Sequence, residues 1–178
     1  MKSRKWCLLI LLALSSLTLV GILASRIPDP LFLNDYSTVV LAEDGQILRV
    51  FLNKGEQWIL PDDGRDIPPK LRAAVIHYED KRFDSHWGID FLAVARALLQ
   101  NVRRGSQISG ASTVTMQVAR LMEPKPRTIP NKLREMAQAL RIELKYSKDE
   151  IMKIYLIHAP YGGNIIGYRT ASLRYFGC

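Results

Sequence analysis

The chain has 178 residues and a net charge of +8 at neutral pH. This length suits one packed domain with an anchor and is too short for two full-sized domains. Of the two cysteines, Cys7 lies in the apolar N-terminal segment and Cys178 is the last residue, so they are not expected to pair. This excludes a scaffold held together by disulfides. The basic excess favours anionic partners such as lipid phosphates.

The N-terminal segment 6–25 predicts a transmembrane helix because it contains no charged side chain. At about 1.5 Å per residue it would span roughly 30 Å, the thickness of a bilayer core. Basic residues precede it and only Arg26 follows closely, so residues 1–5 are predicted to stay in the cytoplasm. A cleaved signal peptide is the alternative, but its apolar region would be shorter. Export of the rest makes nucleic acid an unsuitable partner.

Residues 26–64 predict a linker followed by a β-hairpin. The segments 38–42 and 46–51 are short apolar strands, and the Asp44-Gly45 pair between them is typical of a tight turn.

From residue 65 to 178 the sequence predicts one mainly α domain, because the apolar spacing is helical and glycines and prolines punctuate it. Six helices are expected near residues 68–80, 90–103, 111–122, 130–145, 148–158 and 167–176. In the fourth helix one stripe is expected to face the core, formed by Leu133, Met136, Ala137, Leu140 and Leu144.

Two adjacent acids, Glu79 and Asp80, stand where the first of these helices ends. Carboxylates beside an apolar run need either partners or a function. Glu79 is the candidate general base, since part of its surroundings should be poor in water. Alternatively, both acids pair with Lys81, Arg82 or His86 at the helix end. His86 lacks a second histidine or a cysteine nearby, so it is expected to be a structural hydrogen-bonding residue rather than a zinc ligand.

The segment 109–117 has the composition of a loop that enters a helix, with Ser112 or Thr113 as the cap. Backbone N–H groups at such a terminus attract anions. The sequence contains no Gly-x-Ser-x-Gly, no Ser-x-x-Lys and no phosphate-binding loop, which argues against a serine nucleophile and nucleotide chemistry.

A group of cations follows around the prolines near Glu135, namely Arg120, Arg127, Lys132 and Arg134. Such a group is either a solvated face or a site for a diphosphate, where fixed cations offset charge on a leaving group. The residues alone leave both interpretations open.

Five segments occur in a fixed order behind the predicted anchor. They are residues 79–83 with His86 and Gly88; residues 110–117; Arg127 with Lys132, Glu135, Ala139 and Glu143; residues 146–151 with Tyr155-Leu156; and residues 162–177. Together they resemble the peptidoglycan glycosyltransferase, or transglycosylase, domain of class A penicillin-binding proteins and monofunctional transglycosylases. Residues 116–120 and 159–163 look most like the penicillin-binding protein 1C branch.

The resemblance implies a lysozyme-like fold with a membrane-embedded jaw. The implied reaction polymerises lipid II into glycan strands and releases undecaprenyl diphosphate. In it Glu79 matches the catalytic base and Glu135 the second carboxylate. The positions matching substrate-binding residues are Asp80, Ser112, Thr113, Gln117, Arg120, Arg127 and Lys132.

The implied partners are lipid II, the growing glycan strand, the membrane and other cell-wall synthases. The implied location is the inner (plasma) membrane, with a single pass and the catalytic part on the periplasmic or extracellular side. No cofactor is firmly implied; a divalent cation, Mg or Mn, serves in some family members.

The chain departs from the family pattern at Asn131 and Ile157, where Arg and Asn are usual. Relatives also continue beyond Gly177 with further helices, so the domain is expected to be incomplete at its C-terminus and to lack a transpeptidase domain. Two alternatives follow: an inactive remnant that binds lipid II or synthases without turnover, and a lysozyme-like hydrolase.

Overall fold

The computed structural model describes residue 16 and residues 27–33, 35–104 and 112–177. The predicted tail and anchor, apart from Ser16, and the loop residues 109–111 lie outside this part. Within it, no helix has both the length and the apolar character needed to cross a bilayer.

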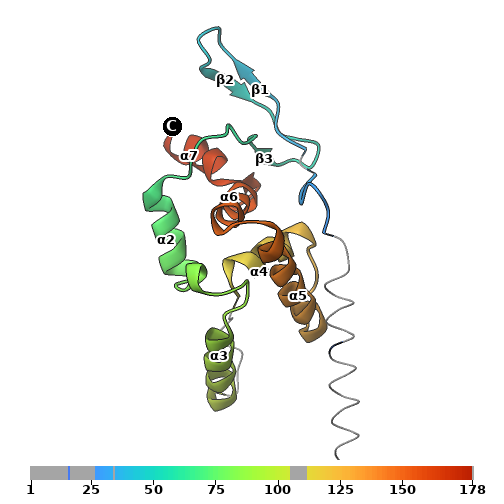
Figure 1. Cartoon of the computed structure of the whole chain (residues 1–178). Helices are drawn as coiled ribbons and strands as arrows, with labels where there is room; N and C mark the ends of the chain where they lie inside the picture. Colours follow the sequence, from blue (N-terminus) through green and yellow to red (C-terminus); the bar gives the residue numbers. More distant parts are fainter. Residues whose placement is uncertain (1–15, 17–26, 34, 105–111, 178) are drawn as a thin grey trace, which may run out of the picture.

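Helices account for about half of the described residues and far exceed the strands, and all six expected helices are present, so the prediction of a mainly α domain is confirmed (Figure 1). In chain order the elements are β1 (Val39–Leu41), β2 (Ile47–Val50), β3 (Trp58–Ile59), α2 (Pro69–Glu79), a 3₁₀ turn (Phe83–Ser85), α3 (Phe91–Arg104), α4 (Val114–Met122), α5 (Ile129–Lys145), α6 (Lys148–His158), β4 (Ile165–Ile166) and α7 (Tyr168–Phe176).

The predicted hairpin is also confirmed. β1 and β2 pair antiparallel with an irregularity in register after Val40, and Gly45 provides a positive φ of 82° at the turn. The hairpin projects from the helical body on the side where α7 ends (Figure 1). β3 and β4 form a short parallel pair that the sequence did not predict, because two residues per strand give no measurable alternation.

The core is built around α4, which packs against α5 and α6. The fully buried apolar side chains include Phe83, Val114, Val118, Ile142 and Met152. Thr113 caps α4, as one of the two predicted candidates, because its Oγ1 accepts a hydrogen bond from the Met116 amide at 3.1 Å. The start of α4 is therefore fixed in the interior.

The predicted core stripe of α5 is wrong in part. Ala137 is buried, but Leu133 and Leu144 are 60% and 68% exposed. The face of α5 that turns inward instead carries Glu135, Ala139 and Ile142. The apolar periodicity identifies the most apolar face of this helix. The face that is buried is a different one, because α4 packs closely against α5 and only small side chains and the paired Glu135 carboxylate fit there.

Gly88 lets the loop after α2 lie directly against α5. Its φ is +74°, and a Cβ atom at this position would lie 2.9 Å from the backbone carbonyl of Ala139. Only glycine tolerates both the left-handed conformation and this contact.

Gly88→Ala is expected to destabilise the protein by about 2 kcal/mol, because positive-φ strain adds to a backbone clash that cannot relax easily. Denaturant unfolding of the full chain in detergent measures the effect. Gly45→Ala is the matched control: its φ is +82° and nothing lies within 4 Å of the added Cβ. Equal losses in the two variants would contradict the close-packing argument.

Candidate active site

Glu79 is the last residue of α2, and its carboxylate is exposed. Its Oε2 accepts a hydrogen bond from Gln117 Nε2 at 2.8 Å, and Gln117 Oε1 accepts from the Tyr155 hydroxyl at 3.5 Å. Burial, reinforced by the charge of Glu79, raises the pKa of Tyr155 to about 12, so the phenol remains a donor. The Glu79 carboxylate is thus oriented by Gln117 and remains accessible to solvent, while part of its surroundings, at Tyr155, is buried.

Asp80 is the buried member of the acid pair. Its Oδ2 accepts from the Val114 amide at 3.0 Å, and both of its oxygens lie 3.0 Å from His86 Nε2. The paired-acid alternative is therefore confirmed for Asp80, and so is the structural role of His86. Because Asp80 fastens the end of α2 to the start of α4, the preceding residue, Glu79, has a fixed backbone.

A second buried network, which sequence reasoning missed, supports the same loop. Glu143 Oε1 accepts from Thr115 Oγ1 at 2.6 Å and from Lys148 Nζ at 2.7 Å. Lys148 also donates to the His86 carbonyl at 2.6 Å and lies over the Phe83 ring. The one sequence signal for this network was that Glu143 and Lys148 both lie within the family segments. Their spacing does not predict an ion pair, because one residue is near the end of α5 and the other begins α6.

Glu135 gathers two of the predicted cations. Arg120 donates to it twice, at 2.8 and 2.9 Å, and Lys132 Nζ lies 3.1 Å from Oε2. Burial would raise the pKa of Glu135, but the bonds from Arg120 and Lys132 hold it below its ordinary value. Burial lowers the pKa of Lys132, while hydrogen bonding to Glu135 raises that of Arg120. One carboxylate faces two cations, so the cluster keeps an excess of positive charge.

The other two cations of this segment, Arg127 and Arg134, are exposed. No carboxylate of the described residues forms an ion pair with either of them. Arg127 lies near enough to Lys132 for its charge to lower the pKa of that amine further. Arg127 is thus open to a ligand beside the Glu135 cluster.

A cavity of about 370 Å³ brings four predicted site residues together, namely Glu79, Asp80, Ser112 and Thr113. Lys81 and Arg96 add positive charge to its wall, whereas Arg82 is paired with Asp90. Ser112 joins this cavity to the cation cluster, because its hydroxyl accepts from Lys132 Nζ at 2.7 Å and lies 3.4 Å from Arg120 Nη2. Ser112 is therefore the contact between the wall of this cavity and the cation cluster, whereas Arg120, Arg127 and Lys132 do not themselves line the cavity.

The start of α4 contributes less to anion binding than its sequence predicts. The Val114 amide donates to Asp80 and the Met116 amide donates to Thr113. Since these two donors are used within the protein, the attraction for an anion at this surface comes mainly from the cationic side chains.

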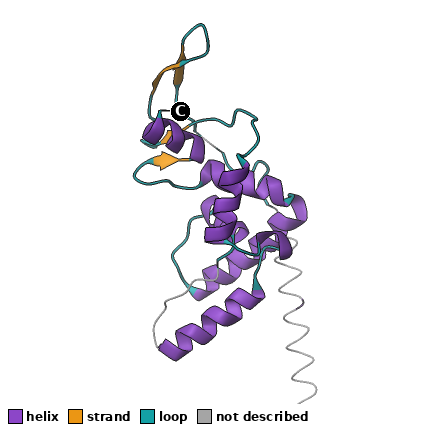
Figure 2. Ribbon diagram, turned by 90° about the vertical axis from the view of Figure 1, so that its left-hand side faces the viewer, coloured by secondary structure: helices purple, strands orange, loops and turns teal. Residues whose placement is uncertain are grey.

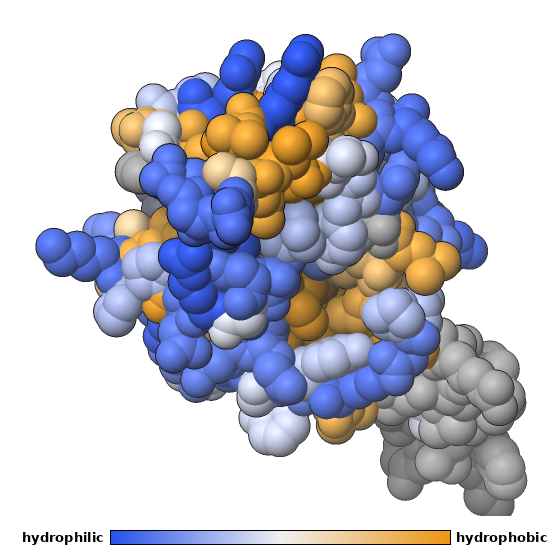
Figure 3. All heavy atoms as spheres, turned by 90° about the horizontal axis from the view of Figure 1, so that it is seen from above, coloured by the Kyte–Doolittle hydropathy of each residue, from blue (hydrophilic) through white to orange (hydrophobic). Residues whose placement is uncertain are grey.

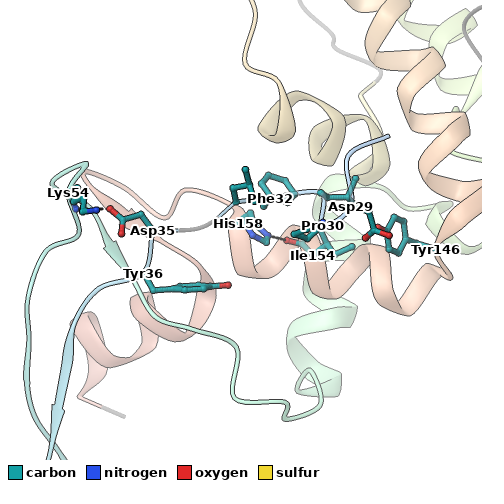
Figure 4. A pocket seen from close by; sticks show the side chains of 11 residues that line it. Asp29, Pro30, Phe32, Asp35, Tyr36, Lys54, Tyr146, Ile154 and His158 are labelled. Atoms are coloured by element: carbon teal, nitrogen blue, oxygen red, sulfur yellow. Dashed lines mark hydrogen bonds between the residues drawn. The ribbon is translucent and has the colours of Figure 1, made fainter. Parts of the chain in front are cut away.

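A larger cavity, of about 860 Å³, lies elsewhere and contains none of the predicted site residues (Figure 4). It forms where the segment preceding β1 crosses α6. The Phe32 ring stacks on His158 with ring centres 3.8 Å apart, and His158 Nδ1 lies 2.8 Å from the Ile154 carbonyl. Burial lowers the pKa of His158 below its ordinary value of 6.5.

Acid is expected to weaken the fold through His158. The unfolded chain binds this proton more tightly than the folded chain, so stability is lost as the pH falls from about 7 through the ordinary histidine pKa. His158→Gln should flatten this part of the stability curve, measured by denaturant unfolding from pH 7.5 downward. His77→Gln, at an exposed position of α2, is the control and should leave the curve of the parent unchanged.

The site thus combines an exposed carboxylate, oriented by Gln117, with a cluster of excess positive charge around Glu135. A sequence model of the Transglycosylase family matches residues 44–178, and the chain belongs to this family. The predicted resemblance is confirmed.

Curated relatives agree with the family assignment. Penicillin-binding protein 1C of Escherichia coli (strain K12) is 42% identical over 150 residues, which are 84% of this chain and 20% of that protein. Penicillin-binding protein 1A of Neisseria flavescens and of Neisseria lactamica are 38% and 40% identical over 138 residues, 77% of this chain and 17% of theirs. The chain spans at most about a fifth of the length of these relatives.

Proposed function

We propose that this chain is a peptidoglycan glycosyltransferase that polymerises lipid II into glycan strands and releases undecaprenyl diphosphate. Family membership supports the activity. The observation that carries the proposal is the position of Ser112, which lines the cavity of Glu79 and also binds Lys132 of the cation cluster.

In this proposal Glu79 takes the proton from the 4-hydroxyl of the incoming disaccharide. The freed oxygen attacks the anomeric carbon of the lipid-linked strand while the bond from that carbon to the diphosphate breaks, and a single displacement inverts the carbon. The structure supports this role, because the Glu79 carboxylate is exposed and one amide, that of Gln117, orients it.

The leaving diphosphate is assigned to the cationic surface. Arg120, Arg127 and Lys132 would offset the charge that accumulates on it, and Ser112 would place it beside the cavity of Glu79. Glu135 holds Arg120 and Lys132 in position. Asp80 and Thr113 are assigned to shaping the cavity wall, because their oxygens already bind protein groups.

The described residues do not fit a divalent-cation site of their own. Asp80 and Glu135 are engaged by protein donors, and no group of three or more His, Cys, Asp or Glu side chains in this part of the chain could hold a metal. No catalytic step is therefore assigned to Mg or Mn.

Membrane attachment follows from the proposed substrate. Residues 6–25 are proposed as a single-pass anchor in the inner membrane, with residues 26–64 and 65–178 on the outer side. α3 projects from the end of the molecule opposite the hairpin (Figures 1 and 2), and it exposes Phe91, Leu92 and Leu99. These side chains, with Ile129 and Leu133 of α5, are assigned to contact with lipid.

Incubation of the full chain in detergent with labelled lipid II tests the proposal. Gel separation should show a ladder of polymerised glycan. Binding of lipid II without polymer would favour the inactive-remnant alternative, and digestion of finished glycan without use of lipid II would favour the hydrolase alternative.

A further inference from the structure

A second surface feature lies at the hairpin, away from the site of Glu79. A cavity of about 400 Å³ runs along the whole of β2 and is closed on its other side by α7. We call it the β2 slot; its wall includes Leu48, Arg49, Val50, Trp58, Leu173 and Arg174. Figure 3 looks at the molecule from the hairpin side and shows apolar side chains gathered among charged ones.

The slot follows an open strand edge. β2 pairs only with β1 among the described strands. The Phe51 amide donates to the Thr38 carbonyl at 2.8 Å, and hydrogen-bonded residues alternate along an antiparallel pair. The backbone groups of Val50 therefore point away from β1, and those of Val39 point away from β2. An unpaired strand edge of this kind is a template for another strand.

The slot also offers two cations without a protein counter-charge. Arg49 lies 4.7 Å from the centre of the Phe51 ring, and Arg174 lies 5.2 Å from that of Trp58. No carboxylate of the described residues pairs with either guanidinium, whereas Arg72, Arg82, Arg120 and Arg169 all form ion pairs.

Apolar surface lies beside these cations. Ile47 and Leu48 are 41% and 67% exposed, although they belong to a strand. Two strands alone bury too little to be stable in water. A third strand with alternating apolar and acidic side chains would cover the apolar surface and neutralise both arginines.

We propose that the β2 slot binds an extended acidic segment of another polypeptide, which pairs with the open edge of β2 as a third strand. Its carboxylates meet Arg49 and Arg174, and its apolar side chains lie on Trp58 and Leu173. This binding does not depend on the proposed glycosyl transfer, because none of the slot residues lines the cavity of Glu79.

Fluorescence anisotropy with two labelled peptides tests the charge requirement on the full chain in detergent. One peptide alternates valine with glutamate, and the other alternates valine with lysine. The glutamate peptide should bind to the parent, and its affinity should fall as the salt concentration rises. Its affinity for the Arg49→Glu or Arg174→Glu variant should be about tenfold lower than for the parent. Arg134→Glu is the control, because it makes the same charge change at an exposed position of α5; this variant should bind the glutamate peptide with the affinity of the parent. Equal binding of both peptides, or none of the glutamate peptide, would overturn the proposal.

Proline substitutions test strand pairing. Val50→Pro removes the N–H from the edge that faces the slot and should abolish binding, while Val39→Pro makes the same change on the opposite edge and should not. Circular dichroism melts confirm that both variants are folded. Equal effects of the two prolines, or self-association of the parent that Val50→Pro abolishes, would overturn the assignment to a separate acidic partner.

Discussion

Glu79→Gln is expected to lower kcat for lipid II polymerisation by about 10²- to 10⁴-fold, the usual contribution of a general base. Glutamine has nearly the same shape and can still meet the amide of Gln117, but it cannot accept a proton. Because Glu79 is exposed and its carboxylate accepts a hydrogen bond from the Gln117 side chain, which glutamine can also meet, the thermal midpoint should stay close to that of the parent. Polymer formation from labelled lipid II and a thermal melt of the same preparation measure both quantities.

Glu43→Gln supplies the control for this experiment, since Glu43 is an exposed acid at the hairpin turn. It makes the same chemical change and should leave polymerisation intact. If Glu79→Gln polymerises lipid II as fast as the parent and Glu43→Gln, the assignment of Glu79 as the base is wrong, even though the family assignment stands.

Helices were the most predictable part of this fold. α6 illustrates why: Ser147 and Glu150 form a capping box at its start, and the next helix-breaking residue is Pro160. Such signals act within one turn of the chain and are visible in the sequence. The pairing of β3 with β4 joins residues about a hundred positions apart. Each strand has only two residues, which is too few for its sequence to predict a strand.

The division of labour within the acid pair could not be predicted. Glu79 and Asp80 are adjacent carboxylates of the same chemistry, and nothing in their sequence context indicates which side chain is exposed and which is buried. The direction in which the chain leaves α2 decides it: the Asp80 side chain reaches the Val114 amide and His86, and Glu79 is left at the surface. This depends on α4, which lies more than thirty residues away in the chain.

The cation cluster shows a similar limit. Sequence proximity suggested that Arg120, Arg127, Lys132 and Arg134 act as a group, but only Arg120 and Lys132 reach Glu135. The link through Ser112 depends on how α5 packs against α4. The family resemblance supplied the residues of the site, and the structure supplies the contacts that connect them.

Glu135→Gln is expected to cost about 2–4 kcal/mol of stability, because removing one partner leaves the cations of a partly buried cluster uncompensated. Water reaches Arg120 and Lys132, whose side chains are 27% and 36% exposed, so the loss should fall in the lower part of this range. The loss should be accompanied by a higher KM for lipid II, since Arg120 and Lys132 are no longer held beside Ser112. Denaturant unfolding and polymerisation rates at several lipid II concentrations measure the two effects.

A double variant separates stability from function at this cluster. Replacing both Arg120 and Glu135 with methionine removes this pair and leaves Lys132 as the one cation that has lost its partner, so it should recover part of the stability that Glu135→Gln loses. It should not recover polymerisation, because a cation assigned to the leaving diphosphate is gone. Recovery of both stability and activity would mean that the Arg120–Glu135 pair serves the fold alone, and the diphosphate would then have to be held by Lys132, Arg127 and the cations that line the cavity of Glu79.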